Sequence, residues 1–249
     1  MSQTILFFGN ERLATGVTTE APVLRALSAK YKIAGVVVAQ NELGRSRADR
    51  EPEIIDVARH SNIPVLAPKK LAEARDELAA FQAQIGVLVA YGKIVPQEII
   101  DLFPKGIINI HPSLLPKHRG PTPVESVILN GEAETGVSLM QLTSQMDAGP
   151  VYAQQTLTLT GNEEKQLLAD KLALAGKDML MEALPGILNG ELLPKPQAEA
   201  SATYDSLIDK SSGSLDFTKP AEQLEREVRA YAGWPRSSTK IGDTDVIVT

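Results

Sequence analysis

The chain contains no cysteine among its 249 residues. Disulfide bonds, thiolate nucleophiles and cysteine-ligated zinc sites are therefore excluded. Because cytoplasmic proteins keep their thiols reduced and do without structural disulfides, the absence of cysteine slightly favours a cytoplasmic location.

Long apolar runs are also lacking, and this absence bears on the membrane. No segment reaches the roughly 18 apolar residues that a membrane-spanning helix needs. Near the start of the chain, the apolar run of residues 5–8 follows no basic residue and is too short for a signal peptide. We therefore expect a cytoplasmic protein with no membrane partner.

An excess of positive charge is missing as well. The formal net charge is −6 at pH 7, which argues against a protein that binds nucleic acid through a globally basic surface. A local basic patch remains compatible with this net charge, because it needs only a few clustered arginines or lysines.

Two common active-site motifs are absent. Gly9 follows an expected strand, but the next residues, Asn10, Glu11 and Arg12, include none of the further glycines that a pyrophosphate-binding loop carries. We therefore reject a dinucleotide or ATP site. Ser113 does not lie in a Gly-x-Ser-x-Gly motif, which argues against a serine hydrolase.

What the sequence does contain is an alternation of short apolar runs with helical patterns. Apolar runs rich in β-branched residues, bounded by Gly and Pro, predict strands at residues 4–8, 33–39, 64–66, 85–90 and 106–110. Helical patterns predict helices at residues 21–28 and 53–60, and residues 71–81 continue the alternation. The expected fold is α/β, with a Rossmann-like, doubly wound and mostly parallel sheet.

Proline and small residues mark a boundary late in the chain. Residues 189–204 include Pro194 and Pro196 and interrupt the helical pattern of residues 167–184. We therefore predict a catalytic domain over residues 1–189, an extended linker over 190–204 and a partial C-terminal domain over 205–249. The last of these should contain a helix at 221–231 and a hairpin around Gly242-Asp243.

Three polar side chains suited to acyl chemistry lie near predicted strands. Asn109 and His111 alternate along an apolar run, so both side chains should point to the same face of the sheet. Asp147 can join them from a loop. Ligands of open α/β sheets bind beyond the carboxyl ends of the strands, where Asn109 and His111 fall, as does Tyr91-Gly92 after another strand.

These three groups suit the transfer of a carbonyl carbon to an amine. When an amine attacks, the carbonyl oxygen becomes an oxyanion, and each donor fixed beside it contributes roughly 3 kcal/mol. The Asn109 amide and the His111 imidazole are such donors, and the Asp147 carboxylate can accept the proton that the amine loses. A single Asn or His in such a place is usually structural, so the prediction rests on the combination.

A longer signature surrounds these residues. It consists of Asn-Ile-His-Pro-Ser-Leu-Leu-Pro at 109–116, Arg-Gly-Pro at 119–121, Glu-Thr-Gly-Val at 134–137 and Met-Asp-Ala-Gly-Pro at 146–150. This signature resembles that of the folate-dependent formyltransferases, and within them most of all the methionyl-tRNA formyltransferases. The likeness covers most of the chain from Phe7 onward.

The resemblance implies transfer of a formyl group from 10-formyltetrahydrofolate to the amino group of initiator methionyl-tRNA, in support of translation initiation. It implies that Asn109, His111 and Asp147 form the catalytic trio, and we expect no metal to take part. We expect the enzyme to act as a monomer. By the same resemblance, the tetrahydrofolate site is lined by Ala90, Tyr91, Gly92, Ser113, Leu114, Leu115 and Pro116.

The family pattern is less complete where the acceptor would bind. Residues 10–16 replace the small residue, proline, acid and phenylalanine that usually follow the first strand. A shortened basic loop at residues 40–53 makes Arg45 and Arg47 candidate contacts to tRNA phosphates, although mixed charges in a loop are most often simply solvated. By the same resemblance, we expect residues 205–249 to form only part of the family's C-terminal β-barrel.

Three alternatives use the same residues. The acceptor could be another amine, such as an amino sugar nucleotide, or it could be water, which gives a formyltetrahydrofolate hydrolase. A folate-binding protein without catalysis would be favoured if Asp147 could not reach the formyl carbon. A metal site made of His111, His118 and Asp147 is not expected, because their spacing matches no usual zinc pattern.

Overall fold

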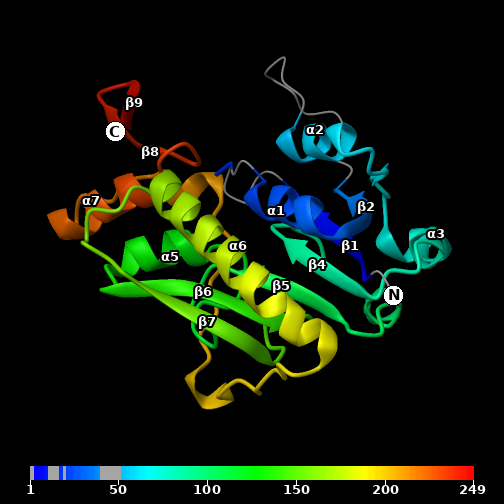
Figure 1. The fold of residues 1–249 in the computed structure, drawn as a ribbon. Coiled ribbons are helices and arrows are strands. Elements are labelled where there is room, and N and C mark those ends of the chain that lie inside the picture. The colour runs from blue at the N-terminus through cyan, green and yellow to red at the C-terminus, as the bar shows by residue number, and fades with distance from the viewer. Residues whose placement is uncertain (1–2, 11–16, 19–20, 40–51) are drawn as a thin grey trace.

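The computed structural model describes residues 3–10, 17–18, 21–39 and 52–249. Within this part of the chain, seven strands form one sheet in the order β3-β2-β1-β4-β5-β6-β7 (Figure 1). The strands are β1 (Thr4–Gly9), β2 (Lys32–Val37), β3 (Val65–Leu66), β4 (Ile85–Val89), β5 (Ile107–His111), β6 (Glu134–Gln141) and β7 (Val151–Thr158).

The sheet is parallel from β3 to β5 and antiparallel beyond. β1 pairs in parallel with β2 and β4, and β4 pairs in parallel with β5. β6 then runs antiparallel to both β5 and β7. The predicted mostly parallel α/β sheet is therefore confirmed, and the antiparallel pair β6–β7 closes one edge of it.

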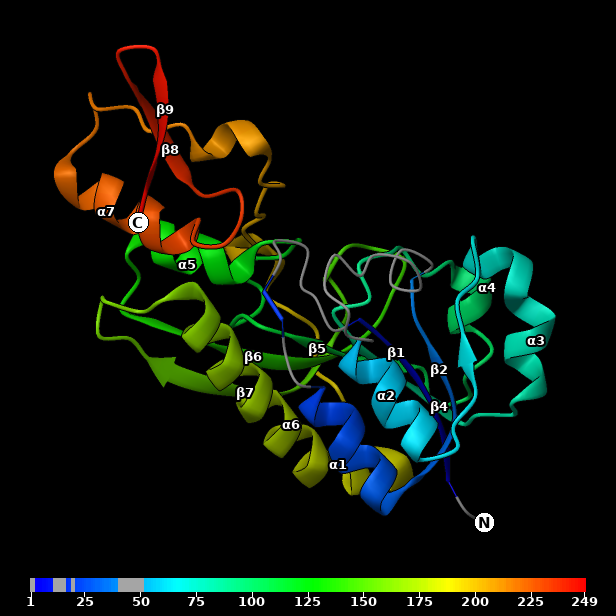
Figure 2. The same ribbon diagram turned by 90° about the horizontal axis from the view of Figure 1, so that it is seen from above.

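Helices cover both faces of the sheet. The larger elements are α1 (Pro22–Lys30), α2 (Glu53–His60), α3 (Arg75–Ala80), α4 (Gln97–Ile100), α5 (Pro123–Asn130), α6 (Lys165–Asn189) and α7 (Ala221–Ala230), with 3₁₀ turns η2 (Leu71–Ala74), η3 (Glu199–Ser201) and η4 (Lys210–Gly213). Figure 2 shows α1, α2 and α6 on one side and α3 and α4 on the other. Each side has its own buried apolar cluster, as a doubly wound sheet requires.

Strand β5 divides its side chains between these two sides. Ile108 and Ile110 belong to the apolar cluster that contains α1 and α6, whereas Ile107 belongs to the other cluster. Because side chains alternate along a strand, Asn109 and His111 lie on the same side as Ile107, away from α6. The fold therefore keeps the two polar residues out of the larger core.

The predicted helix over residues 167–184 is longer than expected. α6 continues through Pro185 to Asn189 and ends at Gly190, whose φ is +82°. Glycine adopts this left-handed conformation without strain, so Gly190 and not Pro185 ends the helix. The predicted end of the helical pattern, at residue 184, is five residues too early.

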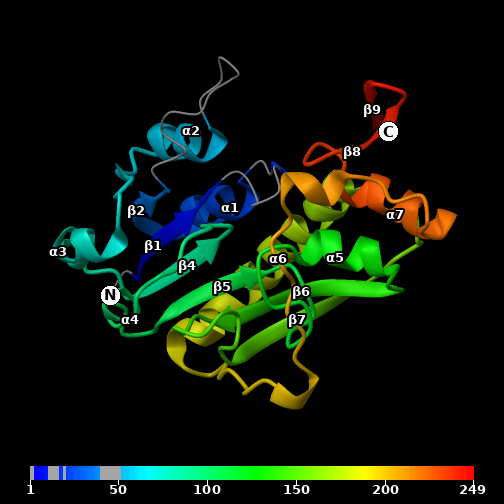
Figure 3. The ribbon, with the colours of Figure 1, turned by 180° about the vertical axis from the view of Figure 1, so that it is seen from behind.

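The segment after α6 lies against the sheet. Val151 and Lys195 exchange two backbone hydrogen bonds of 2.8 Å, and the Arg119 N–H donates to the Thr203 carbonyl at 2.9 Å. Figure 3 shows this segment crossing β7 and β6 on the side away from α6. The residues predicted as a linker are thus brought close to the loop that follows β5.

The C-terminal residues pack on α5 and the start of α6. The Lys165 ammonium group, which is buried, donates to the Trp234 carbonyl at 2.9 Å, and Arg229 donates to the Glu163 carbonyl at 2.9 Å. The predicted hairpin is present as β8 (Ser237–Ile241) and β9 (Thr244–Val248). Its base is held where the Leu215 N–H donates to the Ser238 carbonyl at 2.9 Å.

Gly176 allows α6 to lie close to the sheet, and this yields a test of the packing. A Cβ at Gly176 would lie 2.6 Å from Ile110 Cγ2. We expect Gly176→Ala to lower the free energy of unfolding by roughly 1 kcal/mol, because overpacking costs about 1–3 kcal/mol and outweighs the helix preference of alanine. Urea denaturation measures the change.

Gly186→Ala in the same helix is the matched control. The nearest atom to its added Cβ is Leu192 Cβ at 3.2 Å, so it should destabilise less than Gly176→Ala. Equal or greater stability of Gly176→Ala relative to the unchanged chain would contradict this packing.

Candidate active site

Asn109 and His111 stand side by side on β5 with little solvent exposure. Their exposed fractions are 7% and 5%. Asn109 is paired with Met140 of β6, and His111 is paired with Ser138 of the same strand. Two buried polar side chains need partners, because an unpaired buried polar group costs about 1–3 kcal/mol.

Asp147 supplies one of these partners from the loop between β6 and β7. Its Oδ1 lies 3.5 Å from Asn109 Nδ2 and 3.8 Å from His111 Nδ1. Its Oδ2 accepts a hydrogen bond of 2.8 Å from the Gly120 N–H. The structure thus brings together the three residues that the sequence marked as catalytic, and 15% exposure leaves the Asp147 side chain accessible.

The backbone of Asp147 adopts an uncommon conformation. Its φ is +47°, in the left-handed region that residues other than glycine seldom occupy. Aspartate tolerates this region better than most side chains, but the surroundings must still hold it there. The loop therefore places the carboxylate over β5 at a cost in backbone strain.

The hydrogen bond of His111 to the chain fixes which ring nitrogen carries hydrogen. His111 Nε2 lies 2.8 Å from the His118 carbonyl oxygen. A carbonyl oxygen can only accept, so Nε2 must be the donor. Nδ1, on the Asp147 side, then carries a proton only in the imidazolium form. The oxyanion-donor role expected for His111 therefore requires a positively charged ring.

His118 itself is held between two carboxylates. Its Nδ1 lies 3.0 Å from Asp205 Oδ1, and its Nε2 lies 2.8 Å from Glu132 Oε1. Burial by itself would lower the pKa of His118, but the hydrogen bonds and negative charges of Asp205 and Glu132 outweigh it and raise the pKa. The cation joins the loop after β5 to the chain that follows α6.

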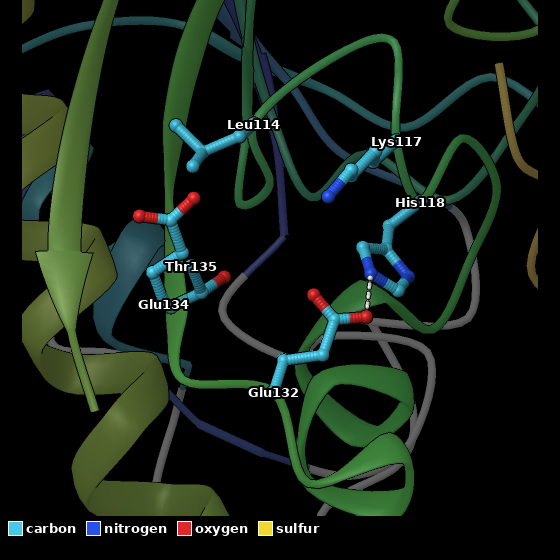
Figure 4. Close-up of a pocket in the computed structure, with 6 residues that line it drawn as sticks. All are labelled: Leu114, Lys117, His118, Glu132, Glu134 and Thr135. Atoms are coloured by element: carbon cyan, nitrogen blue, oxygen red, sulfur yellow. Dashed lines mark hydrogen bonds and ion pairs between the residues drawn. The ribbon is translucent and has the colours of Figure 1, made fainter. Parts of the chain in front are cut away.

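Figure 4 shows the crevice beside His118. It is lined by Leu114, Lys117, His118, Glu132, Glu134 and Thr135. A larger hollow of about 400 Å³ lies between α5 and residues 203–206, and His118 lines this one too. Neither hollow includes the trio, so neither marks the place where the chemistry predicted from the sequence would occur.

The loop at residues 113–116 is anchored on β6 and β7. The Ser138 hydroxyl donates to the Ser113 carbonyl at 2.6 Å and accepts from the Leu115 N–H at 3.1 Å. Gln154 donates to the Leu115 carbonyl at 2.8 Å. Sequence reasoning missed Ser138 and Gln154, although a serine inside the apolar run of β6 is a signal for a buried hydrogen bond.

The four predicted folate contacts in this loop fall into two buried and two partly exposed residues. Ser113 and Leu115 are buried, and the Ser113 hydroxyl donates to the Lys117 carbonyl at 2.7 Å. Leu114 and Pro116 are partly exposed. Side-chain contact with a ligand is thus open to Leu114 and Pro116, while Ser113 and Leu115 shape the loop.

Ala90, Tyr91 and Gly92 follow β4 at its carboxyl end. Tyr91 is buried with its ring edge-on to Phe8 at 5.8 Å, and burial raises the pKa of Tyr91 to about 12. Its carbonyl accepts from Asn10 Nδ2 at 2.6 Å. The Tyr91 side chain therefore belongs to the core, and the accessible part of this strand end is at Ala90 and Gly92.

Three expectations concern the tRNA contacts, a metal ion and the membrane. Arg45 and Arg47 lie outside the described residues. Among the residues that are described, no three His, Cys, Asp or Glu side chains gather to hold a metal ion. No helix within the described ranges is long and apolar enough to cross a membrane.

Polar side chains gathered at the carboxyl end of β5 in an open α/β sheet are an arrangement that an acyl-transfer enzyme can use. Residues 7–184 match the family model of the formyl transferases, and residues 207–249 match the model of the formyl transferase C-terminal domain. The chain therefore belongs to the formyl transferase family.

Its relatives include methionyl-tRNA formyltransferases. The chain is 39% identical to that of Roseiflexus sp. (strain RS-1) over 243 residues, which cover 96% of this chain and 73% of the relative. It is also 39% identical to that of Chloroflexus aurantiacus (strain J-10-fl) over 239 residues, covering 94% and 75%.

The fold is shared with a solved formyltransferase. An N-formyltransferase from Helicobacter canadensis, in complex with folinic acid and dTDP-3-aminofucose, superposes with a TM-score of 0.75 over 99% of this chain and 87% of that one. The identity is 20%, so this likeness concerns the fold alone.

The two carboxylates around His118 predict a pH-dependent contribution to stability. The raised pKa means that the contribution is complete below about pH 6.5, the value of an unfolded histidine, and is lost as pH rises through the folded pKa. Against His118→Gln, the unchanged chain should be more stable by about 2 kcal/mol at low pH, the usual size for hydrogen bonds to a charge.

The measurement is urea denaturation of both chains between about pH 6 and about pH 9, a range that brackets histidine titration. The difference in unfolding free energy should shrink steadily as pH rises. A difference that stays constant or grows with pH would show that His118 is not held as a cation.

Proposed function

We propose that this chain transfers the formyl group of 10-formyltetrahydrofolate to the amino group of methionyl-tRNA. The observation that carries the proposal is the convergence of Asn109, His111 and Asp147 at one point on β5. Methionyl-tRNA formyltransferases that match over most of the chain support the choice of acceptor.

The geometry suggests how the trio divides the reaction. The amine nitrogen forms a bond to the formyl carbon and passes its proton to Asp147, whose Oδ1 faces Asn109 and His111. Asn109 Nδ2 and the charged His111 ring donate to the oxyanion. When the intermediate collapses, the bond to folate N10 breaks, and Asp147 returns the proton to that nitrogen. Atoms and charge then balance.

The two carboxylate oxygens of Asp147 have different partners, and this difference suits Asp147 to accept a proton. Oδ2 is held at 2.8 Å by the Gly120 N–H, which fixes the plane of the carboxylate. Among the described residues, Oδ1 has only the long contacts to Asn109 and His111, at 3.5 and 3.8 Å. An amine can therefore approach Oδ1 without breaking a short hydrogen bond, which favours Oδ1 as the proton acceptor.

We place the folate at the carboxyl ends of β4 and β5. Ala90 and Gly92 border it at one strand end, and Leu114 and Pro116 at the other, where these residues are accessible. Ser113, Leu115 and Tyr91 support it from beneath. Folinic acid in the Helicobacter canadensis protein, which has the same fold, supports a folate co-substrate.

The acceptor side of the proposal rests on other segments. Arg45 and Arg47, together with residues 205–249 as a C-terminal tRNA-binding part, would contact tRNA phosphates and position the acceptor end without reading its sequence. In this proposal, residues 1–189 form the catalytic domain, residues 190–204 the linker and residues 205–249 the partial C-terminal domain. The enzyme would act as a monomer in the cytoplasm, supplying formylated initiator tRNA for translation.

The test is formyl transfer from 10-formyltetrahydrofolate to methionyl-tRNA by the purified chain. Uncharged tRNA and buffer alone are the controls, and a dTDP-amino sugar is the competing acceptor. Transfer to methionyl-tRNA supports the proposal. Release of tetrahydrofolate without an acceptor would indicate a hydrolase. Transfer to the dTDP-amino sugar alone would show that an amino sugar, and not methionyl-tRNA, is the acceptor.

The variant Asp147→Asn tests the trio directly. We expect turnover to fall roughly 100-fold or more, because the amide cannot accept the amine proton. Folate affinity should stay within about twofold, since the Asn oxygen can still accept from the Gly120 N–H. Steady-state kinetics and folate titration measure the two effects, and unchanged turnover would remove Asp147 from the mechanism.

A further inference from the structure

Gln197 holds the backbone of the Asp147 loop from the segment that follows α6. Its Nε2 donates to two carbonyl oxygens, those of Asp147 and Gly149, each at 2.7 Å. An amide NH₂ group has two hydrogens, so both are used. These bonds tie the loop on both sides of Ala148 to a segment 50 residues further along the chain.

The direction of the Gln197 amide is set by Arg119. Arg119 Nε and Nη2 both donate to Gln197 Oε1, at 3.1 and 2.9 Å. A guanidinium group can only donate, so it selects the amide oxygen and turns the NH₂ group toward the loop. The two loop carbonyls, which can only accept, and the guanidinium group, which can only donate, therefore select the same orientation of the amide.

Arg119 is buried and uses all of its side-chain hydrogen-bond donors. Its side chain has no solvent exposure, and its remaining three N–H groups are taken by Glu199 and Tyr204. Nη1 donates to Glu199 Oε1 at 2.9 Å and to the Tyr204 hydroxyl at 2.6 Å, while Nη2 donates to Glu199 Oε2 at 2.8 Å. All five guanidinium hydrogens therefore have a partner, an arrangement that lysine cannot reproduce.

Gly120, the residue after Arg119, also contacts Asp147. Gly120 donates its N–H to Asp147 Oδ2 at 2.8 Å. The backbone at 119–120 thus holds the Asp147 carboxylate directly, and the Arg119 side chain holds the Asp147 backbone through Gln197. Because φ of Asp147 is +47°, the loop needs such external support to keep this conformation.

We propose that Gln197 and Arg119 are positioning residues that keep the Asp147 carboxylate in place over Asn109 and His111. Neither side chain touches the reacting atoms. Their effect is on the geometry of proton transfer, where a displacement of about 1 Å can cost on the order of 100-fold in rate. This inference rests on the proposed function, because it assigns Gln197 and Arg119 to the same reaction.

Gln197→Glu is the sharpest test. It keeps the size of the side chain and the contact with Arg119, but it places an oxygen against the two carbonyl oxygens of the loop. We expect kcat to fall roughly 10- to 100-fold, with the KM of both substrates within about twofold. Rates are expressed per folate-binding site, so a loss of folded protein does not count as a loss of kcat.

A second readout follows the loop itself. Hydrogen exchange of the peptide covering residues 143–150 should become faster in Gln197→Glu, because the loop loses both of its hydrogen bonds to the amide. Arg119→Lys should show the same two changes if it folds. Gln197→Glu is judged alone if Arg119→Lys does not.

Gln166→Glu is the matched control. Gln166 Nε2 also donates to a backbone carbonyl at 2.7 Å, that of Thr18, but it is exposed and makes no contact with the trio. This variant should leave kcat and exchange at 143–150 unchanged. A general effect of the glutamine-to-glutamate change would appear in both variants.

The outcomes separate the two proposals. Unchanged kcat per site in Gln197→Glu, or a raised KM with unchanged kcat, overturns the positioning role while leaving the proposed function intact. If the unchanged chain transfers no formyl group, the proposed function fails, and hydrogen exchange then decides whether Gln197 holds the loop. Unchanged exchange at 143–150 would overturn the inference in that case.

Discussion

The hydrogen bond from the Gly120 N–H to Asp147 Oδ2 is the interaction on which the candidate site depends. It joins the loop after β5 directly to the loop before β7, and Arg119 and Gln197 join the same two loops through side-chain contacts. It also occupies one carboxylate oxygen and so directs the other toward Asn109 and His111. This bond therefore fixes the Asp147 carboxylate relative to the two side chains on β5.

The same loop determines the protonation pattern of the site. The His118 carbonyl takes the hydrogen of His111 Nε2, while the His118 side chain is held as a cation by Asp205 and Glu132. The position of that carbonyl therefore depends on charges that lie outside the trio. Asp205 belongs to the chain beyond α6. A residue late in the sequence therefore helps to position the carbonyl that binds the His111 imidazole on β5.

Much of the fold and of the trio could be predicted from the sequence, because the patterns that indicate them are local. Period-two alternation on β5 placed Asn109 and His111 together, and the apolar runs gave the strands of the parallel half of the sheet. The roles of Gln154 and Gln197 could not be predicted, because each depends on a contact across more than 38 residues. Buried Ser113 and Leu115 show the same limit, since a motif indicates that residues matter but not whether they face a ligand.

The contacts also separate chemistry from the choice of acceptor. The trio is fixed by β5, by Gly120 and by the Asp147 loop, all within residues 109–150. The candidate tRNA contacts lie elsewhere, at Arg45 and Arg47 and beyond residue 205. The residues that hold the trio are therefore different from the candidate acceptor contacts, so the second set can change while the first stays intact. The segment at 195–205 contacts the trio's loops and also leads into the C-terminal part, so it connects the two.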